Sequence, residues 1–177
     1  MVSLMSRTQR IDPSTLALNE SVVSTRRIAK VVKGGRHLRF NALVVVGNGE
    51  GVVGAGLGKA TAIPDAVRKG NAVARKNLIK VPLKGSTIPQ AITASKGGAR
   101  VILKPAPQGT GIIAGHSIRA IMDLVGIKDV VTKSLGSRNP INVVYTTLKA
   151  LSGLKDPAVE IARRNQSKQA NVKSAGG

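Results

Sequence analysis

The sequence predicts an α+β protein made of two small domains. The chain has 177 residues, of which 42% are hydrophobic, so one large or two small cores can form. Strand-like and helix-like segments occur in both halves, and a stretch rich in Pro and Gly at 81–89 separates them. We therefore expect domains at 20–84 and 85–156, preceded by an arm at 1–19 and followed by a basic, flexible tail at 157–177.

The first domain begins with two strands and a turn. Residues 22–33 are β-branched and basic, which favours a strand. Lys-Gly-Gly-Arg at 33–36 is typical of a turn. Residues 37–46 alternate in polarity, which predicts a half-buried strand whose apolar face carries Leu38, Phe40, Ala42, Val44 and Val46.

A third strand and a helix complete this domain. Gly-Asn-Gly-Glu-Gly at 47–51 favours a tight hairpin turn. In the return strand at 52–57, alternate glycines let another backbone come close. The helix follows, with Pro64 and Asp65 suited to its first turn. Its exposed side is expected to carry Arg68, Lys69, Arg75, Lys76 and Lys80.

The second domain alternates strands and helices. We expect strands at 88–95, 99–104 and 129–135. A helix at about 112–125 should stop at Gly126, and a helix from Pro140 to Leu151 should be capped by Asn139. A short helix is expected after Asp156.

Positive charge is the strongest functional signal. The 28 Lys and Arg outnumber the 8 Asp and Glu, so the net charge is +20. Residues 21–104 hold 16 basic and 2 acidic side chains, whereas residues 105–177 hold 10 and 4. Such a charge is tolerable mainly beside a polyanion, so nucleic acid is the expected partner. An anionic membrane ranks second, because no basic helix has a bulky apolar face.

Several classes of site are excluded by composition. There is no Cys, so disulfides, thiolate metal sites and Cys nucleophiles cannot form. No apolar run approaches membrane-spanning length, and residues 1–19 lack the apolar core of a secretory signal. The two histidines, His37 and His116, lie in different units. No catalytic triad, metal cluster or paired-carboxylate site is expected.

Three glycine-rich stretches could bind phosphate. Gly58-Lys59 resembles the end of a Walker A loop, but Val53 and Ala60 replace the required Gly and hydroxyl residue. The glycines at 49–54 precede a strand rather than a helix, so they fit a hairpin better.

The third stretch, Gly109 to Ala114, precedes a helix, and Asp129 stands 20 residues after Gly109. That acid lies at the wrong end of its strand for a dinucleotide site. We interpret these backbone amides as available to any phosphate, including an RNA backbone. Since the aromatic residues are only Phe40 and Tyr145, base-stacking sheets are disfavoured. The class of partner that fits best is folded RNA, recognised through its phosphates and its shape.

Four sequence blocks resemble a known family. They lie at 33–36 (KGGR), 45–60 (VVGNG followed by VGAGLGKA), 109–115 (GTGIIAG) and 136–144 (GSRNPINVV). In this order and spacing they resemble bacterial small-subunit ribosomal protein number five, over about Asn19 to Gln166. The resemblance implies a first domain like a double-stranded-RNA-binding fold without its first helix. It also implies a second domain with a four-stranded sheet, two helices and a left-handed βαβ crossover.

The resemblance also implies a function. Such a protein is a structural constituent of the cytoplasmic small ribosomal subunit, not an enzyme. It binds 16S rRNA, supports assembly and head–body conformation, contributes to translational accuracy and contacts ribosomal proteins four and eight. No cofactor, membrane or small-molecule substrate is implied. The loop at 33–36 should approach the spectinomycin pocket of the rRNA.

Charge and resemblance together nominate the site residues. The residues expected to bind rRNA are Arg26, Arg27, Lys30, Lys33, Gly34, Gly35, Arg36, Arg39, Lys59, Arg68 and Lys69. Those expected at a ribosomal-protein interface that affects accuracy are Gly109, Gly111 and Arg119.

Two alternative functions remain. The second domain's fold recurs in some small-molecule kinases, but those carry a Ser-rich phosphate loop where this chain has Ile112-Ile113. A free-standing regulator that binds many RNAs would show the same charge pattern.

Overall fold

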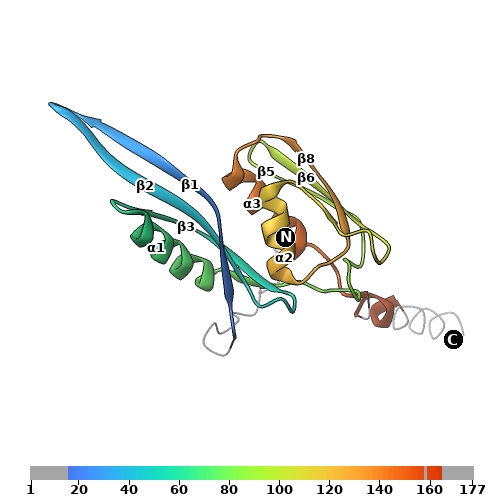
Figure 1. Ribbon diagram of the computed structural model, residues 1–177. Helices are drawn as coiled ribbons and strands as arrows, with labels where there is room; N and C mark the ends of the chain where they lie inside the picture. The colour runs from blue at the N-terminus through green and yellow to red at the C-terminus, as the bar shows by residue number, and fades with distance from the viewer. Residues whose placement is uncertain (1–15, 158, 165–177) are drawn as a thin grey trace, which may run out of the picture.

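Two four-stranded sheets and their helices make up the described part of the chain in the computed structural model (Figure 1). The structure describes residues 16–157 and 159–164. The strand order is β1-β2-β3-β4 in the first sheet and β5-β6-β8-β7 in the second. The expected α+β class is confirmed. The predicted arm at 1–19 and tail at 157–177 lie largely outside the described residues.

The first sheet is antiparallel throughout. Its strands are β1 (Asn19–Val32), β2 (Gly35–Gly47), β3 (Val52–Ala60) and β4 (Leu78–Lys80). The sequence analysis predicts three strands, and the three-residue β4 is a fourth. Helix α1 (Ile63–Lys76) ends before it, so Lys80 belongs to a strand and not to the helix.

Helix α1 packs directly on the glycine face of β3. A Cβ added to Gly56 would lie 2.2 Å from the carbonyl oxygen of Gly70, and one on Gly58 would lie 1.9 Å from that of Ala66. No larger residue fits at either position, so the expected close approach of another backbone is confirmed. This seat fixes α1 on one side of the sheet.

The second sheet is mixed, with two helices. Its elements are β5 (Ile92–Lys96), β6 (Ala99–Pro105), β7 (Ile112–Ile113), α2 (His116–Val125), β8 (Val130–Gly136) and α3 (Pro140–Ser152). β7 pairs in parallel with β8, so β7, α2 and β8 form a βαβ unit. The handedness of this crossover stays a prediction.

Two boundaries in this half differ from expectation. The first strand begins at Ile92 rather than at 88, and Ile88 is instead a fully buried core residue. Ile112 and Ile113 form a short strand rather than the start of the helix. The residue before the helix, Gly115, is extended, so α2 begins only at His116. The helix ends are as expected: Gly126 is left-handed with φ 90°, and the Asn139 side chain accepts a hydrogen bond from the Ile141 amide.

One continuous core joins the two halves. The buried cluster contains Leu43 and Val45 of β2 together with Ile118, Ile121 and Met122 of α2. Helix α2 thus covers the face of the first sheet opposite α1. The prediction that the strand at 37–46 is half-buried is therefore wrong for residues 42–46, which are buried on both faces. The two units have separate sheets and share this core, and the first unit has a second, smaller buried cluster between its sheet and α1.

The turn at 47–51 fastens the two halves together. The amide of Gly49 donates to the carbonyl of Leu124, and that of Gly51 donates to Val125, each at 2.9 Å. A Cβ on Gly126 would lie 1.9 Å from the carbonyl oxygen of Gly49. The predicted hairpin turn is confirmed, and its glycines allow it to dock against the end of α2.

Candidate nucleic-acid interface

The paired strands β1 and β2 extend beyond the rest of the first sheet as a two-stranded ribbon (Figure 1). β3 ends at Ala60, opposite Phe40, so residues 28–39 have no third strand beside them. The turn at the tip is formed by Lys33 and Gly34, with Gly34 at φ 88° and nothing near it. Gly35 is the first residue of β2 and does not adopt positive φ.

Basic side chains dominate this part of the ribbon. Residues 24–41, here called the outer hairpin, contain six Lys or Arg and no Asp or Glu. All six are exposed. Within the part of the chain that the structure describes, none of them forms an ion pair or a side-chain hydrogen bond. Because the described residues offer these cations no partner, they can neutralise an external anion.

The strand register divides five of these cations between two faces, while Lys33 lies in the turn. Opposed residues share a face, and successive residues alternate. One face, the basic face, carries Arg26, Lys30, Arg39 and Lys59, with His37 beside Lys30. Arg26, Asn41 and Lys59 form one row across three strands. Because the ribbon twists, these faces are defined by register and not by one direction in space.

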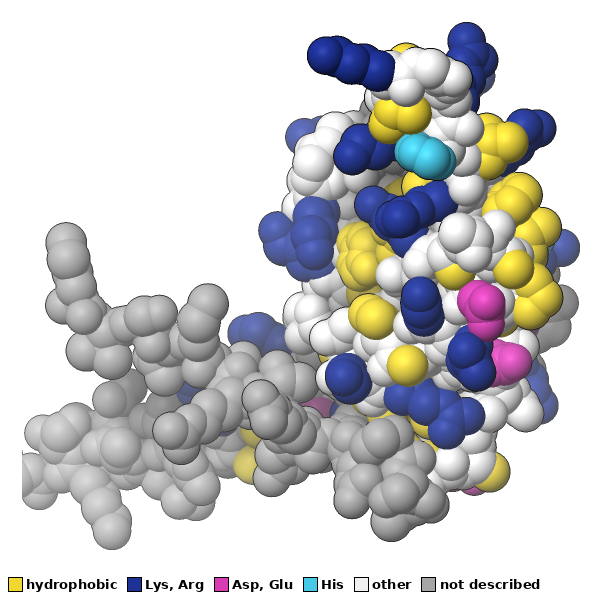
Figure 2. Space-filling model, turned by 90° about the vertical axis from the view of Figure 1, so that its left-hand side faces the viewer, with side chains coloured by type: hydrophobic (Ala, Val, Ile, Leu, Met, Phe, Trp, Pro, Cys, Tyr) yellow, Lys and Arg dark blue, Asp and Glu magenta, His cyan; other side chains and the backbone are white. Residues whose placement is uncertain are grey.

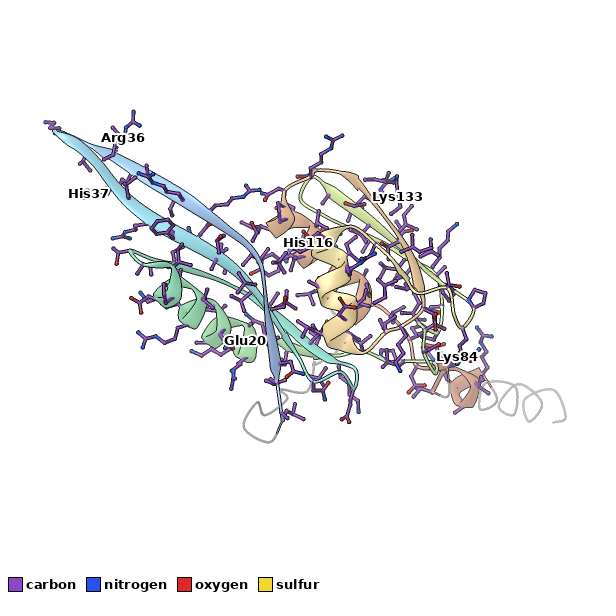
Figure 3. All side chains as sticks on the ribbon, viewed as in Figure 1. Glu20, Arg36, His37, Lys84, His116 and Lys133 are labelled. Carbon is purple, nitrogen blue, oxygen red and sulfur yellow. The ribbon has the colours of Figure 1, made fainter. Side chains whose placement is uncertain are left out.

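The remaining predicted residues lie elsewhere. Arg27 and Arg36 occupy the other face of the ribbon, which closer to the body is covered by α1. Figure 3 shows Arg36 and its neighbour His37 close to the tip. Arg68 and Lys69 lie on α1, and Arg68 is paired with Asp65 at 3.1 Å. Of the eleven predicted rRNA-binding residues, four thus lie on the basic face and three form the tip. The other four lie outside both.

The glycine loop before α2 is already occupied by a carboxylate of the chain. Oδ1 of Asp129 accepts hydrogen bonds from the amides of Gly109 at 2.9 Å and Gly111 at 3.0 Å. Asp129 is only 3% exposed. Hydrogen bonds from Ser86 and from these amides hold the pKa of Asp129 below its usual value, against the opposing effect of burial. The interpretation that these amides are available to phosphate is therefore wrong.

Arg119, the third predicted interface residue, braces the neighbouring edge strand. Its guanidinium donates to the carbonyl of Ile112 in β7 at 3.0 Å. Two shallow depressions flank this arginine, one towards Asp123 and Lys128 and the other towards Thr132 and Lys133. Arg119 is close to the glycine loop in the fold, so the three predicted interface residues share one region.

Other kinds of site find no support in the described residues. His37 lies on the outer hairpin and His116 at the start of α2 (Figure 3). No group of three His, Asp or Glu side chains that could hold a metal occurs in the described ranges. No helix of the described chain is long and apolar enough to span a bilayer.

Comparison with known proteins decides the family. The model for the N-terminal domain of ribosomal protein S5 matches residues 18–82, and that for its C-terminal domain matches residues 94–165. The chain belongs to the ribosomal protein S5 family. A small ribosomal subunit protein uS5 from Dehalococcoides mccartyi strain CBDB1 is 46% identical over 164 residues, which cover 93% of this chain and 95% of that protein. Another from Chloroflexus aurantiacus is 47% identical over 161 residues, covering 91% and 90%.

Membership in this family confirms the resemblance and decides against an enzyme. Proteins of the ribosomal protein S5 family are structural and non-enzymatic, so the kinase alternative is rejected. Sequence reasoning missed Asp129 as the residue that shapes the glycine loop, and it missed Asn41 within the row of Arg26 and Lys59. A sequence signal for Asp129 exists, because it is one of only eight acids and follows a glycine-rich loop.

Proposed function

We propose that this chain, a structural constituent of the small ribosomal subunit, binds 16S rRNA mainly through its outer hairpin. The observation that supports this most is that the outer hairpin has no acid and carries six exposed cations, none of them paired within the described chain. In folded RNA, phosphates are the groups that such cations bind, and a thin ribbon can reach them between helices.

The two faces of the ribbon would share this task unequally. Four cations of the basic face lie on three adjacent strands, so they can follow neighbouring phosphates of one RNA segment. Figure 2 looks at the molecule from the hairpin side, where Lys and Arg side chains are spread over the face and reach its upper end. The Asp and Glu groups visible in that view lie lower on the molecule.

The region of Gly109, Gly111 and Arg119 is proposed as a contact with neighbouring ribosomal proteins, for which proteins four and eight are the candidates. Asp129 already satisfies the loop amides, so the loop can present a fixed backbone shape to a protein surface. Loss of that shape would alter translational accuracy through the neighbouring protein rather than through RNA affinity.

Co-sedimentation with small subunits in high salt tests the proposal. The variant R26Q/K30Q/R39Q/K59Q removes the basic face, and K84Q/R100Q/K104Q/K149Q removes four exposed cations outside the hairpin as a matched control. We expect the wild type and the control to remain bound and the first variant to dissociate. Equal retention of both variants would contradict a role for the hairpin. Dissociation of the wild type itself would favour a loose, free-standing RNA regulator.

A further inference from the structure

The face of the outer hairpin opposite the basic face carries an apolar stripe. By register, Val31 and Leu38 share this face with Phe40, and Val31 is diagonal to Leu38 across the two strands. Val31 is 75% exposed and Leu38 is 42% exposed, and Phe40 is half-buried. Arg36 and Arg27 lie at the two ends of the stripe on the same face.

This stripe is the uncovered continuation of a core. Further along β2, the same face carries Ala42, Val44 and Val46, which are fully buried beneath α1. The helix begins only at Ile63, just after β3 ends at Ala60 opposite Phe40. No described segment of the chain covers the stripe beyond that point. Isolated exposed apolar residues are ordinary, but a contiguous row on a projecting arm is not.

The charge around the stripe limits what can cover it. Both flanking charges are arginines, and residues 24–41 contain no acid, so the surface is apolar with a positive rim. Unpaired nucleotides in folded RNA offer the complement, since their bases and riboses present apolar faces beside negative phosphates. Aliphatic and aromatic side chains contact such bases, while arginines at the rim bind the adjoining phosphates.

The opposite face favours RNA over a protein as this occupant. The ribbon is only two strands wide, and its other face carries Lys30 and Arg39 directly behind the stripe. A folded RNA that receives those cations on one side of so thin a ribbon can also contact its other side with unpaired nucleotides.

We propose that the stripe of Val31, Leu38 and Phe40 packs against unpaired nucleotides of the rRNA, so that the outer hairpin reads phosphates with one face and bases or riboses with the other. This inference rests on the proposed function. It adds a distinct, salt-independent contribution to binding, because apolar contacts release no counterions.

The test compares V31T/L38T with the basic-face variant R26Q/K30Q/R39Q/K59Q, using a small-subunit rRNA fragment over a range of salt. Threonine keeps the preference for strand structure, and V22T, at 43% exposure on the same face near the body, is the matched control. We expect V31T/L38T to bind about tenfold more weakly with an unchanged salt slope, and chemical probing to show newly accessible unpaired bases. We expect V22T to bind like the wild type.

Each other outcome is informative. Unchanged affinity of V31T/L38T, while the basic-face variant binds weakly, overturns the apolar contact and leaves the proposed function standing. Unchanged affinity of both variants means that the hairpin does not bind RNA at all. Normal RNA binding with failed incorporation beside other ribosomal proteins assigns the stripe to a protein partner and overturns the inference. The single variant V31T, altered at a 75% exposed position, repeats the test if the double variant is unstable.

Discussion

Two glycine-containing hairpin turns in the first sheet have opposite surroundings. The turn at Lys33 and Gly34 projects from the molecule, and nothing lies within 4 Å of a Cβ placed on Gly34. The turn at 47–51 is docked on α2, where Gly49 and Gly51 donate to Leu124 and Val125. The first turn is exposed and flanked by cations, whereas the second forms the contact between the two units. A glycine-rich turn therefore indicates a binding loop only when its surroundings leave it free.

The largest difference is expected between two alanine substitutions, one at Gly126, against which the turn at 47–51 docks, and one at Gly34 in the free turn. Gly126 and Gly34 have nearly the same backbone, with φ of 90° and 88°. At Gly126 an added Cβ would collide with the Gly49 carbonyl at 1.9 Å, whereas at Gly34 it meets open space. We expect G126A to lower the free energy of unfolding by at least about 3 kcal/mol and G34A by about 1 kcal/mol, which reflects backbone strain alone.

Denaturant unfolding of the two variants provides the measurement. Equal losses would mean that the turn at 47–51 does not hold the two halves together. Because the halves share one buried cluster, G126A should also lower the unfolding midpoint of both together rather than separate them.

The next largest effect concerns function at the free turn. G34D places an acid between Lys33 and Arg36, at a surface position where Asp tolerates positive φ better than most residues. We expect a folded protein whose rRNA affinity falls about tenfold, roughly as expected when one phosphate contact becomes a repulsion. Ribosomes that carry it should respond differently to spectinomycin. An unfolded variant, or unchanged drug response with unchanged rRNA protection at this site, would count against the account.

A smaller effect is expected from D129N. Since the folded-state pKa of Asp129 is lowered, its ionised form stabilises the fold above the usual carboxyl pKa, and that stability is lost as pH falls through the folded-state value. We expect D129N to reduce Tm by a few degrees at neutral pH and to weaken the loss of stability below about pH 4. An unaltered acid limb of the Tm profile would show that the carboxylate does not hold the loop at Gly109 and Gly111. D123N, at an exposed acid of α2, is the control.

The sequence predicts local structure here better than long-range packing. Alternation in residues 37–46 correctly places Leu38, Phe40 and Ala42 on one face, because strand geometry fixes that pattern. It cannot show that the opposite face of Leu43 and Val45 is buried, since the covering helix α2 starts only at His116. The three-residue β4 is too short to leave a pattern of its own.

The candidate site follows the same rule. Net charge locates the outer hairpin, because cations concentrate there in sequence as well as in space. The division into two faces needs the register, which the two-residue turn at Lys33 and Gly34 sets by pairing Val32 with Gly35. Arg68 and Lys69 belong to the same basic half of the sequence as the hairpin residues, but they lie on helix α1 and so on another surface. Asp129 stands out in the sequence, but its hydrogen bonds to the amides of Gly111 and Gly109 escape prediction because these residues lie 18 and 20 positions away.

The most direct test of the central claim is the salt dependence of rRNA binding. Each phosphate contact contributes about −0.9 to the slope of log affinity against log salt on a duplex, so removal of four real contacts should flatten the slope by roughly 3–4. We predict that change for R26Q/K30Q/R39Q/K59Q and a change below about 1 for K84Q/R100Q/K104Q/K149Q. The same slope for the wild type and the basic-face variant would mean that those four side chains face solvent and would contradict the claim that the outer hairpin is the main rRNA-binding element.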